Sequence, residues 1–216
     1  MDIIRIQECA LSYPSTLRKY LGDDAPKSIM ALGNIEILQK NKIALFCSVK
    51  CPGKLIIQSY DLAKQWGEAG TTVIGGFHSP MERECLNILL RGKQPDIVCP
   101  ARSIVGMRLR VEYKQPLADG RLLLLSSFEA KQRRITVENA IIRNRFVAAL
   151  ADAVFVAYAE PGGKTEQFCR EIVSWGKPLY TFVDSANANL LKLGAKPVHS
   201  YNQDPFSEQS RSSTAP

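Results

Sequence analysis

The sequence predicts an α/β fold in which a mainly parallel sheet carries helices on both of its faces. From Lys42 onward, short apolar runs of strand length alternate with longer helical patterns, which is typical of a doubly wound parallel sheet. The composition, 45% hydrophobic and 23% charged, is that of an ordinary globular domain, and 216 residues can bury one sizeable core. We therefore expect one doubly wound α/β domain.

The first 41 residues are expected to form a short helical lead-in to this domain. Turn and cap signals at Tyr13-Pro14, Gly22-Asp23-Asp24 and Gly33-Asn34 break the segment into short helical stretches. The core is expected over residues 42–197. Residues 198–216 are polar and Ser-rich, so we expect them to be a disordered tail.

The alternating elements begin with the apolar strand pattern KIALFC at residues 42–47. Further strands are expected at residues 71–74, 96–99, 121–126, 153–158 and, as the last strand, 179–182. Helices are expected at residues 54–69, 79–91, 103–117, 136–150 and 165–175. The helix at 79–91 has the clearest start, with Ser79 as N-cap, Pro80 at the first position and Glu82 as the partner in a capping box.

Several functional classes are disfavoured by the sequence. No apolar run approaches the roughly 20 residues of a membrane helix, and no signal peptide is evident, so we expect a cytoplasmic protein. Cys47 and Cys51 have no His or second Cys pair nearby to complete a zinc site, and free thiols are expected. No nucleophile triad, metal cluster or paired carboxylate stands out. We therefore expect no metal and no cofactor, and an enzyme is the less favoured interpretation.

Positive charge is concentrated in one part of the chain. Residues 102–145 hold ten Lys and Arg, mostly Arg, against four acidic residues, so this segment carries most of the net charge of +7. Arginine is well shaped to bind phosphate, and a basic stripe attracts polyanions. A solvated face that only aids solubility remains the alternative. The basic residues are Arg102, Arg108, Arg110, Lys114, Arg121, Lys131, Arg133, Arg134, Arg143 and Arg145.

Ligands of a doubly wound sheet bind at the carboxyl ends of the strands, so the strand-to-helix junctions hold the candidate site residues. The first junction offers Ser48 and Lys50 at a helix start, where anions are favoured. The second offers Gly75 and Gly76, which let a ligand approach the backbone, and His78, which could bind phosphate. A purely structural role for His78 is the alternative.

Two later segments complete the set of candidates. Arg143 and Arg145 lie about 200° apart on a helix, so one of them could reach a ligand while the other pairs with a carboxylate such as Glu138 or Asp152. After the strand at 153–158, Gly162 and Gly163 could form an N–H concavity for phosphate. Lys164 would add charge there and Thr165 could cap the next helix. A plain tight turn is the alternative.

The chain resembles the DNA-processing protein A family (DprA, also called Smf) over roughly residues 11–185. The opening stretch from Tyr13-Pro14 to Gly33-Asn34 is similar to the family's YPxxL…GN pattern, and Arg143-Asn144-Arg145 with the following residues is similar to its RNRxIAxLSDxVxV segment. The chain departs from the family at the first loop, which is Cys47-Ser48-Val49-Lys50 in place of Gly-Ser-Arg, and at the Gly75–Pro80 loop.

The resemblance implies a Rossmann-like core that binds single-stranded DNA without chemistry, forms a homodimer and acts in DNA recombination or uptake, with a RecA-type recombinase as a possible partner. By position it assigns the binding role to Ser48, Lys50, Gly75, Gly76, His78, Arg143, Arg145, Gly162, Gly163, Lys164 and Thr165.

A different function stays open. Pro161–Glu166, PGGKTE, is similar to the PGGxGTxxE motif of the LOG nucleotide phosphoribohydrolases. Such an enzyme, or a nucleotide sensor, would bind a small nucleotide, and the enzyme would need a carboxylate near the sugar. Glu82 and Glu166 are the candidates for that carboxylate. A stripe of several cations favours a polymer ligand over a small nucleotide.

Overall fold

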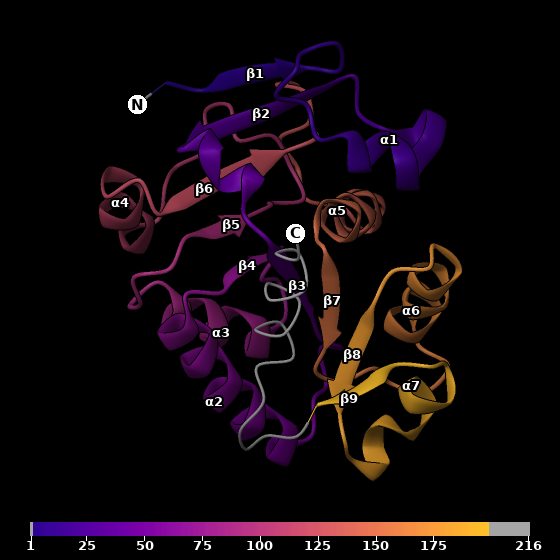
Figure 1. The fold of residues 1–216 in the computed structure, drawn as a ribbon. Coiled ribbons are helices and arrows are strands. Elements are labelled where there is room, and N and C mark those ends of the chain that lie inside the picture. The colour runs from indigo at the N-terminus through magenta and orange to yellow at the C-terminus, as the bar shows by residue number, and fades with distance from the viewer. Residues whose placement is uncertain (1, 199–216) are drawn as a thin grey trace, which may run out of the picture. The chain divides into compact units, whose positions relative to one another are not determined.

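The computed structural model describes residues 2–198, and the chain divides into two compact units. Within the described residues, unit 1 consists of residues 2–44, 72–77 and 95–152, and unit 2 consists of residues 45–71, 78–94 and 153–198. Neither unit is one continuous segment of the chain, as the colours of Figure 1 show. The expected tail, apart from residue 198, lies outside the described residues.

The strands of unit 1 form a mixed sheet in the order β1-β2-β6-β5-β4-β3. From β6 (Leu122–Ser126) through β5 (Asp96–Val98) and β4 (Thr72–Gly75) to β3 (Lys42–Phe46), neighbouring strands are parallel. The last two residues of β3 belong to unit 2. The parallel pairs place the carboxyl ends of β4, β5 and β6 along one edge of the unit.

The lead-in of unit 1 contains two strands that the sequence analysis did not predict. Besides α1 (Ser15–Leu21), it holds β1 (Ile4–Gln7) and β2 (Ser28–Gly33), with 3-10 turns at Gly22–Asp24 and Ile35–Gln39. Both strands are antiparallel to their neighbours, β1 to β2 and β2 to β6. The expectation of a wholly helical lead-in was wrong because β2 is an apolar run without a period, and its pairing with β6 decides its conformation.

The helices of unit 1 are α1, α4 (Val111–Ala118) and α5 (Val137–Leu150). Helix α5 packs against α1, as Figure 1 also shows, and buries Phe146 while α1 buries Leu17. Helix α4 covers only the second half of the predicted helix at 103–117. Residues 99–110 form a loop instead, in which Gly106 has a φ of 67°, a left-handed conformation that ends regular structure.

Unit 2 contains the end of β3 followed by β7 (Ala153–Val156), β8 (Leu179–Phe182) and β9 (Lys196–Val198) in that order. Strands β7, β8 and β9 are parallel to one another. The prediction that residues 179–182 form the last strand was wrong, because β9 follows after α7 (Ala188–Lys192). Pro197 obscured β9 in the sequence, and it is tolerated because β9 is an edge strand that can lack one N–H donor.

The core of unit 2 is aromatic. Trp66, on α2 (Gly53–Ala69), meets Phe155 of β7 edge to face at 5.5 Å between ring centroids, and Phe155 meets Phe182 of β8 in the same way at 4.9 Å. Helix α2 also packs against α3 (Pro80–Leu89), and α6 (Lys164–Ser174) contacts β8 and α7. At the start of α3 the predicted capping box of Ser79 and Glu82 is confirmed.

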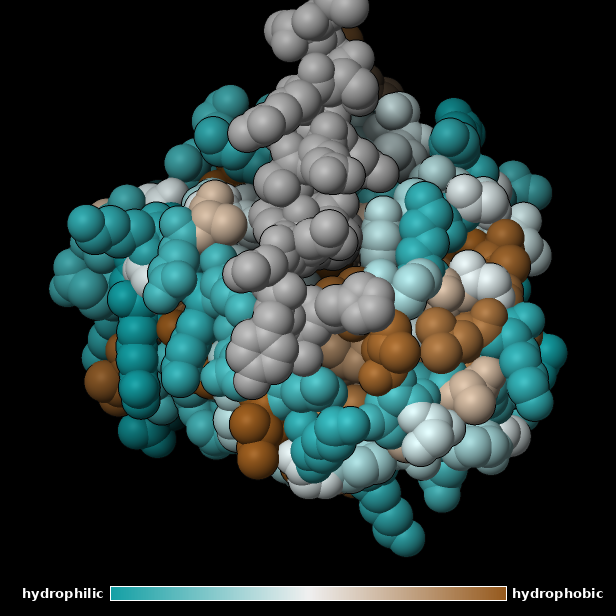
Figure 2. All heavy atoms as spheres, turned by 60° about the horizontal axis from the view of Figure 1, so that its bottom comes forward, coloured by the Kyte–Doolittle hydropathy of each residue, from teal (hydrophilic) through white to brown (hydrophobic). Residues whose placement is uncertain are grey.

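The predicted fold class, a Rossmann-like α/β fold with a mainly parallel sheet, is confirmed. Over residues 2–198, no helix has the length and apolar character needed to cross a bilayer. On the face drawn in Figure 2, hydrophilic side chains predominate and hydrophobic ones form smaller groups between them.

Candidate functional site

The carboxyl edge of unit 1 holds a buried arginine above a glycine turn. Arg143 of α5 is only 4% exposed, and it donates from Nε to Asn144 Oδ1 at 2.8 Å and from Nη1 to the Cys99 carbonyl at 3.1 Å. A Cβ added to Gly76, in the turn after β4, would lie 1.6 Å from Arg143 Nη1. Gly76 therefore lacks a side chain where the guanidinium lies, so it is the arginine that approaches this backbone.

The turn itself is strained at Phe77. Phe77 has a φ of 47°, which is uncommon for a residue with a side chain, and its ring is buried at 5% exposure. The ring packs against Gly75, where an added Cβ would lie 3.0 Å from it. Strained backbone of this kind concentrates at functional sites. The buried ring, however, offers no free face for stacking a base.

Arg145 faces away from Arg143, as the helical angle between them predicts. Its Nη1 donates to Asp24 Oδ2 at 2.8 Å, so this ion pair joins α5 to the turn after α1. The sequence analysis considered Glu138 and Asp152 as carboxylate partners, whereas Asp152 accepts a hydrogen bond from the Lys42 backbone at 2.8 Å. The ion pair connects the two segments that carry the family resemblance.

Most of the remaining basic residues lie on two loops of unit 1 that leave the carboxyl ends of β5 and β6. The loops, residues 99–110 and 127–136, are joined because the Ser103 N–H donates to the Gln132 carbonyl at 2.8 Å. We call them the basic loops. Ser126 Oγ also donates to the Arg102 carbonyl at 2.9 Å. The Lys and Arg residues of the basic loops are Arg102, Arg108, Arg110, Lys131, Arg133 and Arg134.

The basic loops form an electropositive surface. All of their Lys and Arg residues are exposed except Arg102, which is half-buried, and Glu129 is their single acidic residue, paired with Lys131 at 3.2 Å. Lys114 and Arg121 are not part of this surface, since Lys114 lies on α4 and Arg121 precedes β6, where it pairs with Asp119 at 3.3 Å. The charge of residues 102–145 thus gathers at the carboxyl edge of unit 1.

In unit 2, Ser48 acts as a link between two loops. Its N–H donates to the Tyr158 carbonyl at 2.9 Å, and its Oγ accepts from the Glu160 N–H at 3.0 Å. Ser48 is 8% exposed, whereas Lys50, two residues later, is exposed. The structure thus ties the loop after β3 to the loop after β7, and of these two candidates Lys50 presents its side chain to solvent.

Glu82 is a buried anchor for the loops around it. Its carboxylate accepts backbone hydrogen bonds from Cys47 at 2.8 Å, His78 at 2.7 Å and Ser79 at 3.2 Å, and the residue is 6% exposed. A carboxylate engaged by these donors holds the start of α3 against the end of β3, and it is not placed to serve as a base near a sugar. The His78 side chain is exposed, and the His78 carbonyl accepts from the Arg83 guanidinium.

The glycine turn after β7 is held by its own hydrogen bonds. The Gly163 N–H donates to the Glu160 carbonyl at 2.9 Å, and the Gly162 N–H donates to Glu166 Oε2 at 2.9 Å. Gly163 is the N-cap of α6, so Thr165 lies inside the first turn and the prediction that it caps the helix was wrong. Lys164 is exposed at the helix start. The two glycine N–H groups therefore shape the turn.

Glu166 organises this turn. Besides the Gly162 N–H, its carboxylate accepts from Asn189 Nδ2 at 2.8 Å and Arg170 Nη2 at 2.5 Å, and its side chain is 8% exposed. The hydrogen bonds from Asn189, Gly162 and Arg170 lower the pKa of Glu166 to about 2, because they stabilise the ionised carboxylate. Glu166 is therefore charged at neutral pH and fully engaged in the turn.

The substitution Glu166→Gln is expected to weaken the acid dependence of stability. A pKa lowered from 4.5 to about 2 contributes stability above the unfolded pKa and loses it as the pH falls through the folded pKa. The wild-type chain should therefore lose unfolding free energy between about pH 5 and pH 2, and the variant should lose less. Urea denaturation at a series of pH values measures both. Equal loss in Glu166→Gln and in wild type, with the exposed Glu68→Gln as control, would contradict this role.

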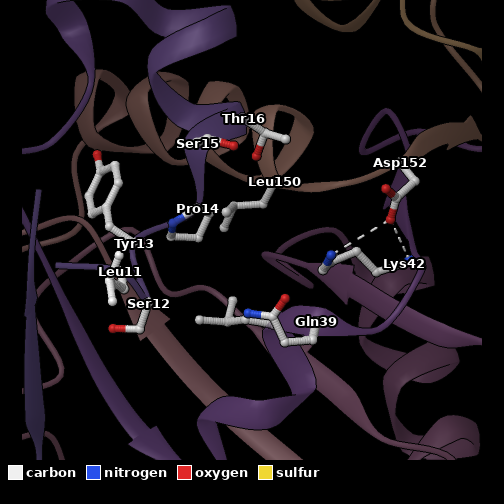
Figure 3. A pocket seen from close by; sticks show the side chains of 11 residues that line it. Leu11, Ser12, Tyr13, Pro14, Ser15, Thr16, Gln39, Lys42, Leu150 and Asp152 are labelled. Carbon is white, nitrogen blue, oxygen red and sulfur yellow. Dashed lines mark hydrogen bonds and ion pairs between the residues drawn. The ribbon is translucent and has the colours of Figure 1, made fainter.

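A polar cavity of about 260 Å³ lies in unit 1 at the amino end of β3 (Figure 3). Lys42, with a side chain 8% exposed, pairs there with Asp152 at 3.6 Å, and burial lowers the pKa of Lys42. The Tyr13-Pro14 turn also lines the cavity, and Figure 3 shows the Gln39 amide and the Lys42 amine on its wall. The sequence analysis missed this site, because no local pattern brings Lys42 to Asp152.

Within residues 2–198, no group of three or more His, Cys, Asp or Glu side chains is placed to hold a metal ion. Glu82 and Glu166, the carboxylates considered for chemistry on a nucleotide, are both engaged by backbone donors. Exposed cations are gathered on the basic loops. The arrangement is suited to binding a polyanion.

Comparisons with known proteins agree with this geometry. The sequence model of the family described as DNA recombination-mediator protein A matches residues 5–205. A comparison with curated proteins finds no match. Among solved structures, DNA processing protein A from Helicobacter pylori aligns with a TM-score of 0.77 at 18% identity, covering 99% of this chain and 97% of that one.

Two further structures show the same type of fold. DNA processing protein A from Streptococcus pneumoniae aligns with a TM-score of 0.75 at 18% identity, over 91% of this chain and 71% of that one. The molybdenum cofactor carrier protein from Chlamydomonas reinhardtii is more distant, with a TM-score of 0.55 at 12% identity over 80% of this chain and 99% of that one. At these identities the likenesses establish the fold.

Proposed function

We propose that this chain, which belongs to the DNA recombination-mediator protein A family, binds single-stranded DNA through the basic loops of unit 1. The observation that carries the proposal is the gathering of six Lys and Arg against one acidic residue on two loops joined by the Ser103–Gln132 hydrogen bond. The similar Helicobacter pylori structure is described as showing a single-stranded DNA binding mode of that protein. Several exposed cations along one edge fit a polymer of phosphates better than a single nucleotide.

In unit 1, Gly75, Gly76 and Arg143 support this surface. Arg143 bonds the Cys99 carbonyl, at the base of the first basic loop, and so holds the turn after β4 against that loop. Its buried guanidinium also contributes positive charge beneath the edge. We assign it a positioning role, with phosphate contact made by the exposed arginines, and Arg145 supports α5 through Asp24.

In unit 2, the proposed phosphate-binding segments are the loop with Ser48 and Lys50 and the start of α6. Lys50 and Lys164 supply exposed charge, and His78 is exposed just before α3. Ser48, Gly162 and Gly163 shape the two loops through their backbone hydrogen bonds. Thr165, in the first turn of α6, completes the helix start.

The binding is proposed to involve no chemistry on the ligand. The alternative, release of a base from a nucleoside monophosphate, would need a carboxylate free to approach the sugar. Glu82 and Glu166 instead accept backbone hydrogen bonds that shape the loops. Release of free base during incubation with nucleoside monophosphates, measured by chromatography, would contradict this part of the proposal.

Family membership also supports a homodimer and an interaction with a RecA-type recombinase, and we propose both as properties of this chain. Sedimentation velocity over a range of concentrations tests the dimer. Pull-down of a purified RecA-type recombinase by the tagged chain, in the presence and absence of DNA, tests the partner.

The full chain is expected to bind a fluorescein-labelled dT oligonucleotide, with an affinity that falls steeply as salt rises. Each phosphate neutralised by a Lys or Arg lowers the slope of log K against log salt by about 0.7 on a single strand. Fluorescence anisotropy across a salt series measures both the affinity and the slope. Absence of binding at low salt would contradict the proposal, and binding without salt dependence would contradict the basic loops as its surface.

A further inference from the structure

Two cysteines of unit 2 lie together at the carboxyl end of β3. Cys47 directly follows the strand, and Cys51 comes four residues later, just before α2. Their thiols are joined by a side-chain hydrogen bond. All of the cysteines in the described chain are reduced. The two sulfurs therefore face each other across the short loop Cys47-Ser48-Val49-Lys50-Cys51.

The two thiols differ in accessibility. Cys47 is 7% exposed, and its backbone is fixed because its N–H donates to Glu82 Oε1 at 2.8 Å. Cys51 is half-buried, so a small molecule in solvent can reach its sulfur. An exposed thiol that is attacked first and a buried thiol beside it are the arrangement that a reversible dithiol requires.

The thiols also differ in acidity. The hydrogen bond from the Cys47 thiol lowers the pKa of Cys51, while the pKa of Cys47 is raised because it keeps that shared proton and is buried near Glu82 and Cys85. The thiolate is the form that attacks a disulfide. Once Cys51 carries a mixed disulfide, the hydrogen bond and negative charge that hold the proton on Cys47 are gone, and Cys47 can react in turn.

We propose that Cys47 and Cys51 form a reversible dithiol site that reacts with low-molecular-weight disulfides and closes to an intramolecular disulfide. In the first step, the Cys51 thiolate attacks one sulfur of the small disulfide, forming a mixed disulfide and releasing one small thiolate. In the second, Cys47 attacks the Cys51 sulfur, and the other small thiol leaves, while the Cys47 proton passes to the released thiolate. The dithiol is oxidised and the small disulfide is reduced by the same two electrons.

The site is separate from the other cysteines of the chain. Cys85, the nearest of them, is fully buried, and its Sγ contacts the Ser59 carbonyl at 3.6 Å and Met81 Sδ at 3.3 Å. Cys9 is exposed but lies in unit 1, which makes it a matched control for simple accessibility. Oxidation would enclose Ser48 and Lys50 in a small covalent ring, so the site would set the backbone of that loop.

The experiment treats the folded full chain with oxidised glutathione, quenches it with acid, alkylates the remaining thiols and analyses it by mass spectrometry after trypsin digestion. Trypsin cleaves after Lys50, between the two cysteines. The expected product is therefore a pair of peptides, residues 43–50 and 51–54, that are linked until dithiothreitol is added. Cys47→Ser is expected to stop at glutathione on Cys51, and Cys51→Ser is expected to leave Cys47 unmodified.

The control Cys9→Ser is expected to form the linked pair as the wild type does. Oxidation of the wild type at Cys9 with Cys47 and Cys51 left reduced would overturn the proposal. Modification of Cys47 in Cys51→Ser would overturn the order of the two steps. The readout is covalent and involves no DNA, so its failure is distinct from a failure of the proposed DNA binding.

Discussion

Replacing Gly76 by alanine is expected to destabilise the folded chain by about 2–4 kcal/mol, because the new methyl group occupies the place of the Arg143 guanidinium. The added Cβ would lie 1.6 Å from Nη1 and 2.0 Å from Cζ of Arg143. The guanidinium is 4% exposed and bonds the Cys99 carbonyl and Asn144, so it can move only by breaking these bonds. A buried cation without its partners is costly.

Urea denaturation of Gly76→Ala measures this effect. The matched control is Gly53→Ala, since a Cβ at Gly53 meets nothing within 4 Å and alanine is favoured at a helix start over glycine. The control is expected to be as stable as the wild type or slightly more stable. Equal stability of Gly76→Ala and wild type would show that Arg143 is mobile, and would remove its assigned positioning role.

The double variant Arg133→Ala/Arg134→Ala is expected to bind the dT oligonucleotide about tenfold more weakly at moderate salt, with a shallower salt dependence. Both arginines are exposed on the second basic loop, and neither is part of the buried core, so the fold should be unaffected. Losing two phosphate contacts on a single strand should reduce the slope of log K against log salt by about 1.4.

A charge-matched control separates this effect from the general loss of positive charge. Lys40→Ala/Lys114→Ala also removes two exposed cations from unit 1, but Lys40 precedes β3 and Lys114 lies on α4, away from the basic loops. Its affinity and salt slope are expected to stay close to those of the wild type. Equal weakening in both double variants would show that net charge, and not the basic loops, governs binding.

Much of the fold could be predicted from the sequence because its signals are local. The strands at residues 42–46 and 179–182 are buried apolar runs, and Ser79, Pro80 and Glu82 mark the start of α3 through contacts within one helical turn. The family resemblance also depends on short ordered motifs. Their three-dimensional link, the Asp24–Arg145 ion pair, was not predicted because 121 positions separate the two residues.

The candidate site was predicted less completely than the fold. Gly76 was expected to let a ligand approach the backbone, but Arg143 fills that space. The glycines of the turn after β7 were expected to offer N–H groups to phosphate, but Glu160 and Glu166 accept those hydrogen bonds. The residue types were informative in both cases. Their partners came from other parts of the chain.

By itself, the sequence determined the α/β class, most of the helices and strands, and the concentration of positive charge in residues 102–145, because these depend on periodicity and composition. Only the tertiary structure decided that β1 and β2 are strands, that Arg143 is buried while Arg133 is exposed, and that Glu82 and Glu166 hold loops. The physical reason is that strand pairing, burial and carboxylate hydrogen bonds depend on neighbours distant in sequence, which no local pattern specifies.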